Sequence, residues 1–214
     1  MTGMGDDMST VMSEVDCCML ERYTHEYHLS HVLGFKVTYS SSFVLDAPTG
    51  KIGFYLRHVV YGLHLPSSRF FLEVLCFYKV HLVQLCPNVV SKIVTFKVFC
   101  IAHEISLDVT LFCDFYRLKK YGDWFSFNSR HSPLSLDLFC SNGTWKSRFY
   151  WVDVHRLCLL FVPCYVPLGD ESISLSAEQR AFVPLFPHFC VKISFQPEVV
   201  LALYHMNPFW KARC

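Results

Sequence analysis

The sequence has little of three features that often reveal a function, namely charge, glycine and long hydrophobic runs. Only 17% of its residues are charged, and 19 basic side chains against 18 acidic ones leave a formal charge of +1. This balance gives no overall field to attract nucleic acid or an anionic membrane, so any basic surface must be local. The nine glycines are widely spaced, and no glycine-rich phosphate loop occurs among them.

No stretch of about 18 consecutive uncharged residues, the length that a bilayer crossing needs, is present. The longest uncharged run of the second half lies between Arg156 and Asp170 and is interrupted by prolines. The N-terminus carries Asp6 and Asp7 where a secretory signal has basic residues. We therefore expect no membrane association and an intracellular, reducing location, cytoplasmic or nuclear, and no secretion.

The sequence also lacks the spacings that bind metals. Its 11 cysteines include no Cys-x-x-Cys pair, and in a reducing compartment most are expected to be buried thiols. His25, His28 and His31 follow Cys17 and Cys18 closely, but three-residue steps spread the histidines over about 120° of a helix. We predict surface histidines and no metal site.

Catalytic motifs are missing as well. We find no Gly-x-Ser-x-Gly elbow and no His-Glu-x-x-His pair. The sequence therefore predicts no catalytic residues, no cofactor and no small-molecule substrate, and we interpret the chain as a non-enzyme.

What the chain does have is apolar and aromatic side chains, at 52% and 16% of its residues, enough for a sizeable core. The small, acidic residues 1–16 are expected to form a flexible leader. Residues 17–153 are expected to form the domain. Prolines break every periodic run in residues 154–214, which we interpret as a divergent extension with a short terminal helix from Pro197.

Three helices are predicted between residues 68 and 120 from apolar spacing. The first follows Ser67 or Ser68 as N-cap and buries Phe71, Val74, Leu75 and Tyr78. The second begins at Pro87 and places Val89, Ile93, Phe96 and Cys100 on one stripe. The third follows Ser106 as N-cap and runs to Tyr121-Gly122, with Leu107, Leu111, Phe115 and Leu118 buried.

Short aromatic runs separated by turn residues follow, and they predict a small antiparallel sheet over residues 122–153. The runs are Asp123–Phe127, Leu134–Cys140 and Ser147–Val152, with a hairpin at Ser141-Asn142-Gly143, and one or two further strands are expected within Phe35–Tyr61. The predicted fold class is therefore α+β, with about three helices (68–120) packed on the sheet.

One segment combines basic and aromatic residues. Between Arg117 and Arg156, seven basic residues face three aspartates, a local excess of four positive charges. Such a segment is typical of surfaces that contact phosphates and stack bases, although the same pattern also occurs where aromatics fill a core and cations keep a strand soluble. The candidate nucleic-acid residues are Arg117, Lys119, Lys120, Trp124, Trp145, Lys146 and Arg148.

Several motifs in order resemble a plant family, the putative gypsy-type transposon domain proteins, also labelled putative gypsy-type transposase. The resemblance covers roughly Cys18 to Asp153, and Pro197–Trp210 is weakly similar to a later helix of the family. The motifs are Gly50–Tyr55, Pro66–Leu75, Val80–Leu85, Phe96–Cys100, Leu111–Tyr116, Gly122–Phe127 and Gly143–Val152.

The resemblance implies retroelement ancestry but no established activity and no catalytic residues. The chain lacks the protease, polymerase and integrase motifs of such elements. Our favoured interpretation is a non-catalytic structural or interaction protein, gag-like, that self-associates or binds a protein partner. The alternative is a nucleic-acid-binding module that uses residues 117–150. A third interpretation, DNA strand transfer, requires a cluster of carboxylates to bind a divalent ion.

Overall fold

The computed structural model describes residues 7–26, 42–63, 67–130, 135–136, 143–153 and 191–192, and it confirms the predicted α+β class. The helices of these residues are α1 (Cys17–Glu26), α2 (Leu56–Val60), α3 (Arg69–Tyr78), α4 (Pro87–Ala102) and α5 (Val109–Phe115), with short 3-10 helices η2 (Leu82–Gln84) and η3 (Gly143–Trp145). The strands are β1 (Lys51–Tyr55), β2 (Tyr116–Tyr121), β3 (Trp124–Ser129), β4 (Ser135–Leu136), β5 (Phe149–Asp153) and β6 (Val191–Lys192).

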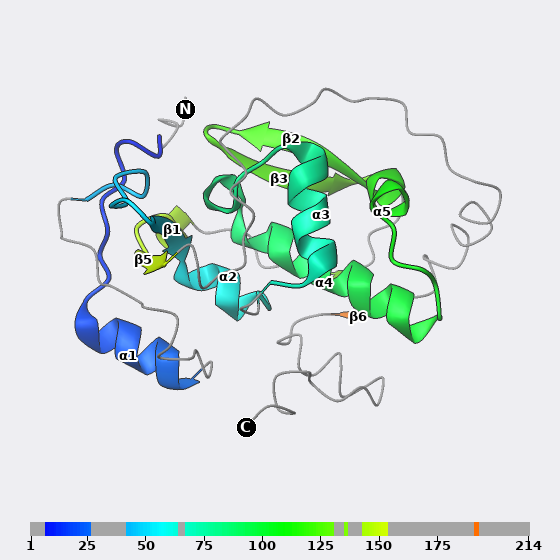
Figure 1. Ribbon diagram of the computed structural model, residues 1–214, viewed down its shortest axis with the longest axis horizontal. Helices are drawn as coiled ribbons and strands as arrows, with labels where there is room; N and C mark the ends of the chain where they lie inside the picture. The colour runs from blue at the N-terminus through cyan, green and yellow to red at the C-terminus, as the bar shows by residue number, and fades with distance from the viewer. Residues whose placement is uncertain are drawn as a thin grey trace.

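The strands pair in three separate two-stranded sheets, whereas one sheet was predicted over residues 122–153. β1 pairs antiparallel with β5, β2 pairs antiparallel with β3, and β4 pairs parallel with β6. β3 and β5 therefore belong to different sheets, as Figure 1 shows. Each of these strands has four buried residues in succession, so side chains on both of its faces pack against other parts of the domain. Each strand pairs with a different partner, which leaves both of its faces available for this packing.

Helix α3 forms as predicted. The Ser68 hydroxyl accepts a hydrogen bond from the Phe71 amide at 3.4 Å, and the four residues predicted to be buried are buried. The helix ends at Tyr78 and is capped by Lys79, whose φ of 52° is left-handed, and the Val80 amide then donates to the Leu75 carbonyl at 3.1 Å. This closing bond satisfies a carbonyl of the last turn.

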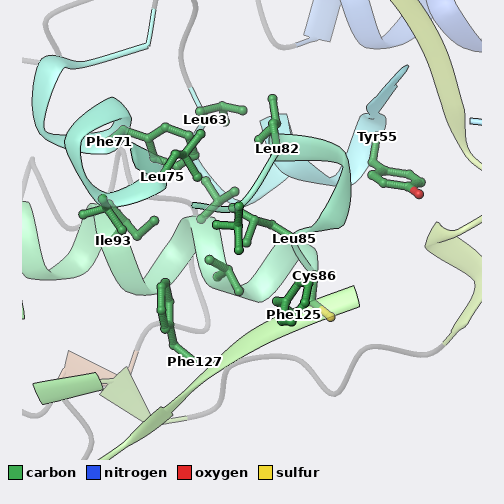
Figure 2. Close-up of a cluster of buried hydrophobic side chains, with 14 of the residues drawn as sticks. Tyr55, Leu63, Phe71, Leu75, Leu82, Leu85, Cys86, Ile93, Phe125 and Phe127 are labelled. Carbon is green, nitrogen blue, oxygen red and sulfur yellow. The ribbon is translucent and has the colours of Figure 1, made fainter. Parts of the chain in front are cut away.

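Helix α4 is the central helix of the domain. The predicted stripe of Val89, Ile93, Phe96 and Cys100 is buried, but so are residues on other sides of the helix, including Val90 and Phe99. α4 contacts α2, α3 and β3. Figure 2 shows Ile93 among buried side chains from α3, from the turn at Leu85 and from β3.

The third predicted helix is shorter than expected, which corrects two sequence predictions. Its N-cap is Asp108, whose carboxylate accepts from the amides of Thr110 and Leu111, and not Ser106. The helix ends at Phe115, and residues 116–121 form β2. The reason is tertiary: β3 offers β2 a full ladder of backbone partners, and a helix continuing to residue 121 would leave that edge unpaired.

The N-terminal segment also differs from its prediction as a leader without structure. Within residues 7–16, Met8 and Val15 are buried in the core. The Ser13 hydroxyl donates to the Phe149 carbonyl at 2.8 Å, and the Glu14 amide donates to the Ser147 carbonyl at 2.7 Å. Met8 and Val15 are too far apart in the sequence to show a helical or strand period. Together with these hydrogen bonds they hold the segment against the β1–β5 sheet.

Other predictions fall outside the described residues. They are the strands expected within residues 35–41, most of the run 134–140, the turn at Ser141-Asn142, the extension over 154–190 and the terminal helix from Pro197. Within the part of the chain that the structure describes, no helix combines the length and the apolar character needed to cross a membrane.

Candidate interaction surface on the β2–β3 hairpin

The candidate nucleic-acid residues lie on and around the hairpin formed by β2 and β3, at the top of Figure 1. Gly122 and Asp123 form its two-residue turn, and Tyr121 pairs with Trp124 across it. Gly122 has a φ of 60°, which the first central position of a type II′ hairpin turn requires and which glycine adopts without strain. The sequence Tyr-Gly-Asp-Trp thus reverses the chain and starts β3.

Three of the predicted residues, Arg117, Lys119 and Lys120, are exposed on β2. Tyr116 is buried and Leu118 is half-buried, so the strand holds the domain by its apolar side chains and presents its cations to solvent. The Lys119 ammonium lies 5.2 Å from the centre of the Tyr121 ring. Neither Lys119 nor Lys120 pairs with a carboxylate among the described residues.

The two predicted tryptophans are core residues. Trp124 is 1% exposed and Trp145 is 4% exposed. Their rings meet edge to face at 5.6 Å between centroids, and the Trp124 indole N–H donates to the Tyr55 hydroxyl at 3.1 Å. These indoles therefore present no open face on which a base could stack.

Lys146 and Arg148, the last two of the candidate nucleic-acid residues, are intermediate in burial between the exposed cations of β2 and the buried tryptophans. The Lys146 ammonium is 4.5 Å from the centre of the Trp124 ring, so this half-buried cation covers the indole. Arg148 is half-buried, and its backbone accepts from the Leu56 amide and donates to the Trp145 carbonyl. The structure therefore splits the predicted set into three exposed strand cations and four buried or half-buried residues, Trp124, Trp145, Lys146 and Arg148.

The outer edge of β2 is a feature that the sequence analysis missed. β3 is flanked on both sides, by β2 and by Leu85, whose neighbour Cys86 donates its amide to the Phe125 carbonyl at 2.9 Å. β2 pairs with β3 alone within the described residues. The sequence signal that could have identified β2 as an edge strand is the cluster of cations Arg117, Lys119 and Lys120, because charged side chains, lysine above all, are typical of edge strands.

Burial changes the pKa values of several side chains near the hairpin. His58 is fully buried between the rings of Phe54 and Tyr55, and desolvation lowers its pKa to about 4 even though Nε2 contacts the Leu85 carbonyl at 3.0 Å. Burial raises the pKa of the Cys86 and Cys113 thiols to about 11. These thiols stay protonated at neutral pH and are poor nucleophiles.

Asp108, Asp123 and Asp153 have structural partners at separate places, and hydrogen bonds with the Ser9 backbone and with Asp123 are among the causes that lower the pKa of Asp7. Asp108 caps α5, and Asp123 accepts from the Met8 amide at 2.9 Å. Asp153 pairs with Lys51 across β1 and β5, with 2.5 Å between Nζ and Oδ1. His25, Cys17 and Cys18 are exposed on α1, and among the described residues no three histidine, cysteine or acidic side chains are placed to hold a metal ion.

Comparison with known proteins confirms the resemblance inferred from the motifs. Residues 53–120 match the model of a family described as "Putative gypsy type transposon". The match runs from β1 to Lys120 and so includes the cations of β2, whereas the resemblance proposed for residues 18–52 and 121–153 lies outside it. No curated protein and no solved structure matches the chain.

Proposed function

We propose that this chain is a non-catalytic interaction domain of retroelement origin, gag-like in that it binds other protein chains. The observation that carries this proposal is the build of the hairpin. Four of its aromatic residues, Tyr116, Trp124, Phe125 and Phe127, lie in the core, whereas Tyr121 and the cations of β2 are exposed. Among the described residues, no strand other than β3 pairs with β2. A surface of this kind can bind a partner through its charges and its backbone groups.

The non-catalytic part of the proposal is supported by the hydrogen bonds and the ion pair that the titratable side chains make within the fold. Asp108 and Asp123 hold backbone amides, Asp153 pairs with Lys51, and His58 contacts the Leu85 carbonyl. Each of these contacts gives the titratable group a structural role in the fold.

Two measurements on the purified full chain test the proposal. Sedimentation velocity and chemical cross-linking over a range of concentrations should show self-association or, in a mixture, a complex with a second protein. A strand-cleavage and strand-transfer assay on DNA with Mg²⁺ or Mn²⁺ should give no product. Metal-dependent cleavage that disappears in Asp108→Asn or Asp123→Asn would overturn the non-catalytic assignment.

The second candidate function is nucleic-acid binding through phosphates. Arg117 and Lys119 occupy alternate positions of β2, which places them on one face about 6.8 Å apart along the strand. This spacing suits successive phosphates of an extended single strand, but Trp124 and Trp145 cannot add the base stacking that single-strand binders use.

Fluorescence anisotropy with a labelled single strand and a labelled duplex, at two salt concentrations, tests this second function. Binding that weakens with salt and is lost on charge reversal of Lys119, Lys120, Lys146 and Arg148 would favour it. Absence of binding at low salt would remove it and leave the protein-interaction proposal standing.

A further inference from the structure

We propose that the outer edge of β2 binds an acidic, extended peptide segment of another protein, which adds as a third strand beside β2. This inference rests on the proposed function, because it assumes that the chain binds protein partners. It goes further by naming the surface, the conformation of the partner and its charge.

The first argument is the charge of the hairpin. Between Tyr116 and Arg130 the chain has four basic residues and a single acidic one, Asp123. The Asp123 carboxylate lies in the turn, where it accepts from the Met8 amide. A ligand approaching β2 therefore meets Arg117, Lys119 and Lys120, and the complementary ligand is anionic.

The second argument is the direction of the backbone groups in β2. The Arg130 amide donates to the Phe115 carbonyl at 2.8 Å, one step beyond the pair Tyr116–Ser129. Bonded positions alternate in an antiparallel ladder, so the backbone groups of Leu118 and Lys120 point to the outer edge. An extended peptide can pair with these groups, and peptide recognition by strand addition gains its affinity in this way.

The third argument excludes a second copy of β2 as the occupant. If β2 of another molecule paired antiparallel with this strand in a register centred on Leu118 or Lys119, Lys119 would lie opposite Arg117 or Lys119 of the partner strand. Like charges directly opposite one another destabilise a sheet. The lysines thus prevent self-pairing at this edge, and they favour a strand that carries carboxylates.

A fourth argument favours a peptide over nucleic acid. Phosphates of nucleic acid can contact the cations and accept from the outward N–H groups of Leu118 and Lys120, but they cannot donate to the outward carbonyls. The buried tryptophans offer nucleic acid no stacking surface. An acidic strand uses both the cations and the edge. Carboxylates at alternate positions of that strand would lie beside Arg117 and Lys119, which share one face of β2.

The test is a fluorescence-anisotropy titration of the full chain with a short labelled peptide of alternating glutamate and valine. Two further probes accompany it: the same peptide N-methylated on alternate amides, which keeps the charge but loses the donors, and a labelled oligothymidylate. We expect the unmodified peptide to bind, the N-methylated peptide to bind at least about fivefold more weakly, and the oligothymidylate not to compete.

Two matched pairs of variants assign the binding to β2. Lys119→Glu should weaken the Kd about tenfold, whereas Arg22→Glu, which reverses an exposed cation on α1, should leave it unchanged. Lys120→Pro removes the charge and an outward N–H, and proline is tolerated at such a position of an edge strand. It should weaken peptide binding about fivefold more than Lys120→Ala, which removes only the charge. Thermal melts establish that each variant is folded.

Several results would overturn the inference. Equal affinity for the two peptides would show that charge alone acts, and stronger binding of oligothymidylate that displaces the peptide would assign the surface to nucleic acid. No peptide binding at low salt, in a chain that still self-associates and cleaves no DNA, would refute strand addition while leaving the proposed function intact. Metal-dependent DNA cleavage would refute the proposed function instead, whatever the peptide result.

Discussion

The indole N–H of Trp124 donates to the hydroxyl of Tyr55 at 3.1 Å, and both side chains are buried. Tyr55 ends β1 and Trp124 begins β3, so this hydrogen bond joins the two antiparallel sheets across 69 positions of sequence. Trp145 packs edge to face on both rings, at 4.9 Å from Tyr55 and 5.6 Å from Trp124. The hairpin that carries the β2 cations is thereby held against the rest of the domain.

Removing the Tyr55 hydroxyl should therefore destabilise the fold. Tyr55→Phe leaves the Trp124 N–H buried without its acceptor, and we expect the free energy of unfolding to fall by about 1–3 kcal/mol. Urea denaturation followed by tryptophan fluorescence measures the loss. Tyr121→Phe is the control, because Tyr121 is 47% exposed and its hydroxyl bonds Asn128 at the surface. An equal loss in both variants would contradict the role assigned to the Tyr55 hydroxyl.

Burial of His58 predicts a stability that falls with acid. The pKa of His58 in the folded protein is about 4, below its ordinary value of 6.5, so the unfolded chain takes up the proton first as the pH drops. The contribution of the neutral ring is complete above about pH 6.5 and is lost between pH 6.5 and 4, up to about 3 kcal/mol.

Urea midpoints measured from pH 7 to 4 test this dependence. His58→Gln keeps a donor for the Leu85 carbonyl but does not titrate in this range, so its stability should vary less with pH than that of the unaltered protein. His25→Gln, on the exposed face of α1, should preserve the full dependence. Identical pH profiles for the unaltered protein and His58→Gln would show that other groups cause the acid sensitivity.

Gly53 marks a place where β1 passes too close to another segment for any side chain. A Cβ on Gly53 would contact the Val44 side chain and would lie 2.6 Å from the Val44 carbonyl oxygen. Gly53→Ala should therefore cost about 1–3 kcal/mol, because backbone would have to move. Thermal melting compares it with Gly50→Ala, where the added Cβ has open space and only the φ of 80° opposes it. A neutral Gly53→Ala would contradict the close approach.

The N-cap of α5 provides a test that separates two neighbouring residues. Asp108→Ala removes the acceptor of the Thr110 and Leu111 amides and should cost about 1 kcal/mol. Ser106→Ala changes an exposed residue outside the helix and should cost no more than a few tenths. The reverse order of the two losses in urea denaturation would restore Ser106 as the cap.

Local chemistry made much of the helical part predictable. The spacing of Phe71, Val74, Leu75 and Tyr78 and the Ser68 cap determined α3, and Pro87 with its apolar stripe determined α4. Each of these signals lies within a few turns of one helix, so it can be read without knowing which residues come together in space. Gly122 was predicted to end a helix, whereas it lies in the β2–β3 turn, where glycine adopts the required φ freely.

Residues 116–121 and the tryptophans could not be assigned in this way. Phe115 and Leu118 fit a helical face, whereas Tyr116 and Leu118 fit a strand, and only the availability of β3 as a partner decided between them. Likewise, basic residues interleaved with Trp124 and Trp145 are compatible with either a binding face or a core. In the fold, the hydroxyl of Tyr55, 69 positions away in the sequence, accepts from the Trp124 indole N–H, which allows this ring to be buried.

The sequence by itself determined the class of the fold, the places where α3 and α4 begin and the excess of positive charge near β2, because these follow from local spacing and composition. Tertiary structure decided which strands pair, which aromatic rings are buried and which cations remain exposed. The reason is that burial and backbone pairing are shared between residues distant in sequence, such as Tyr55 with Trp124 and Lys51 with Asp153.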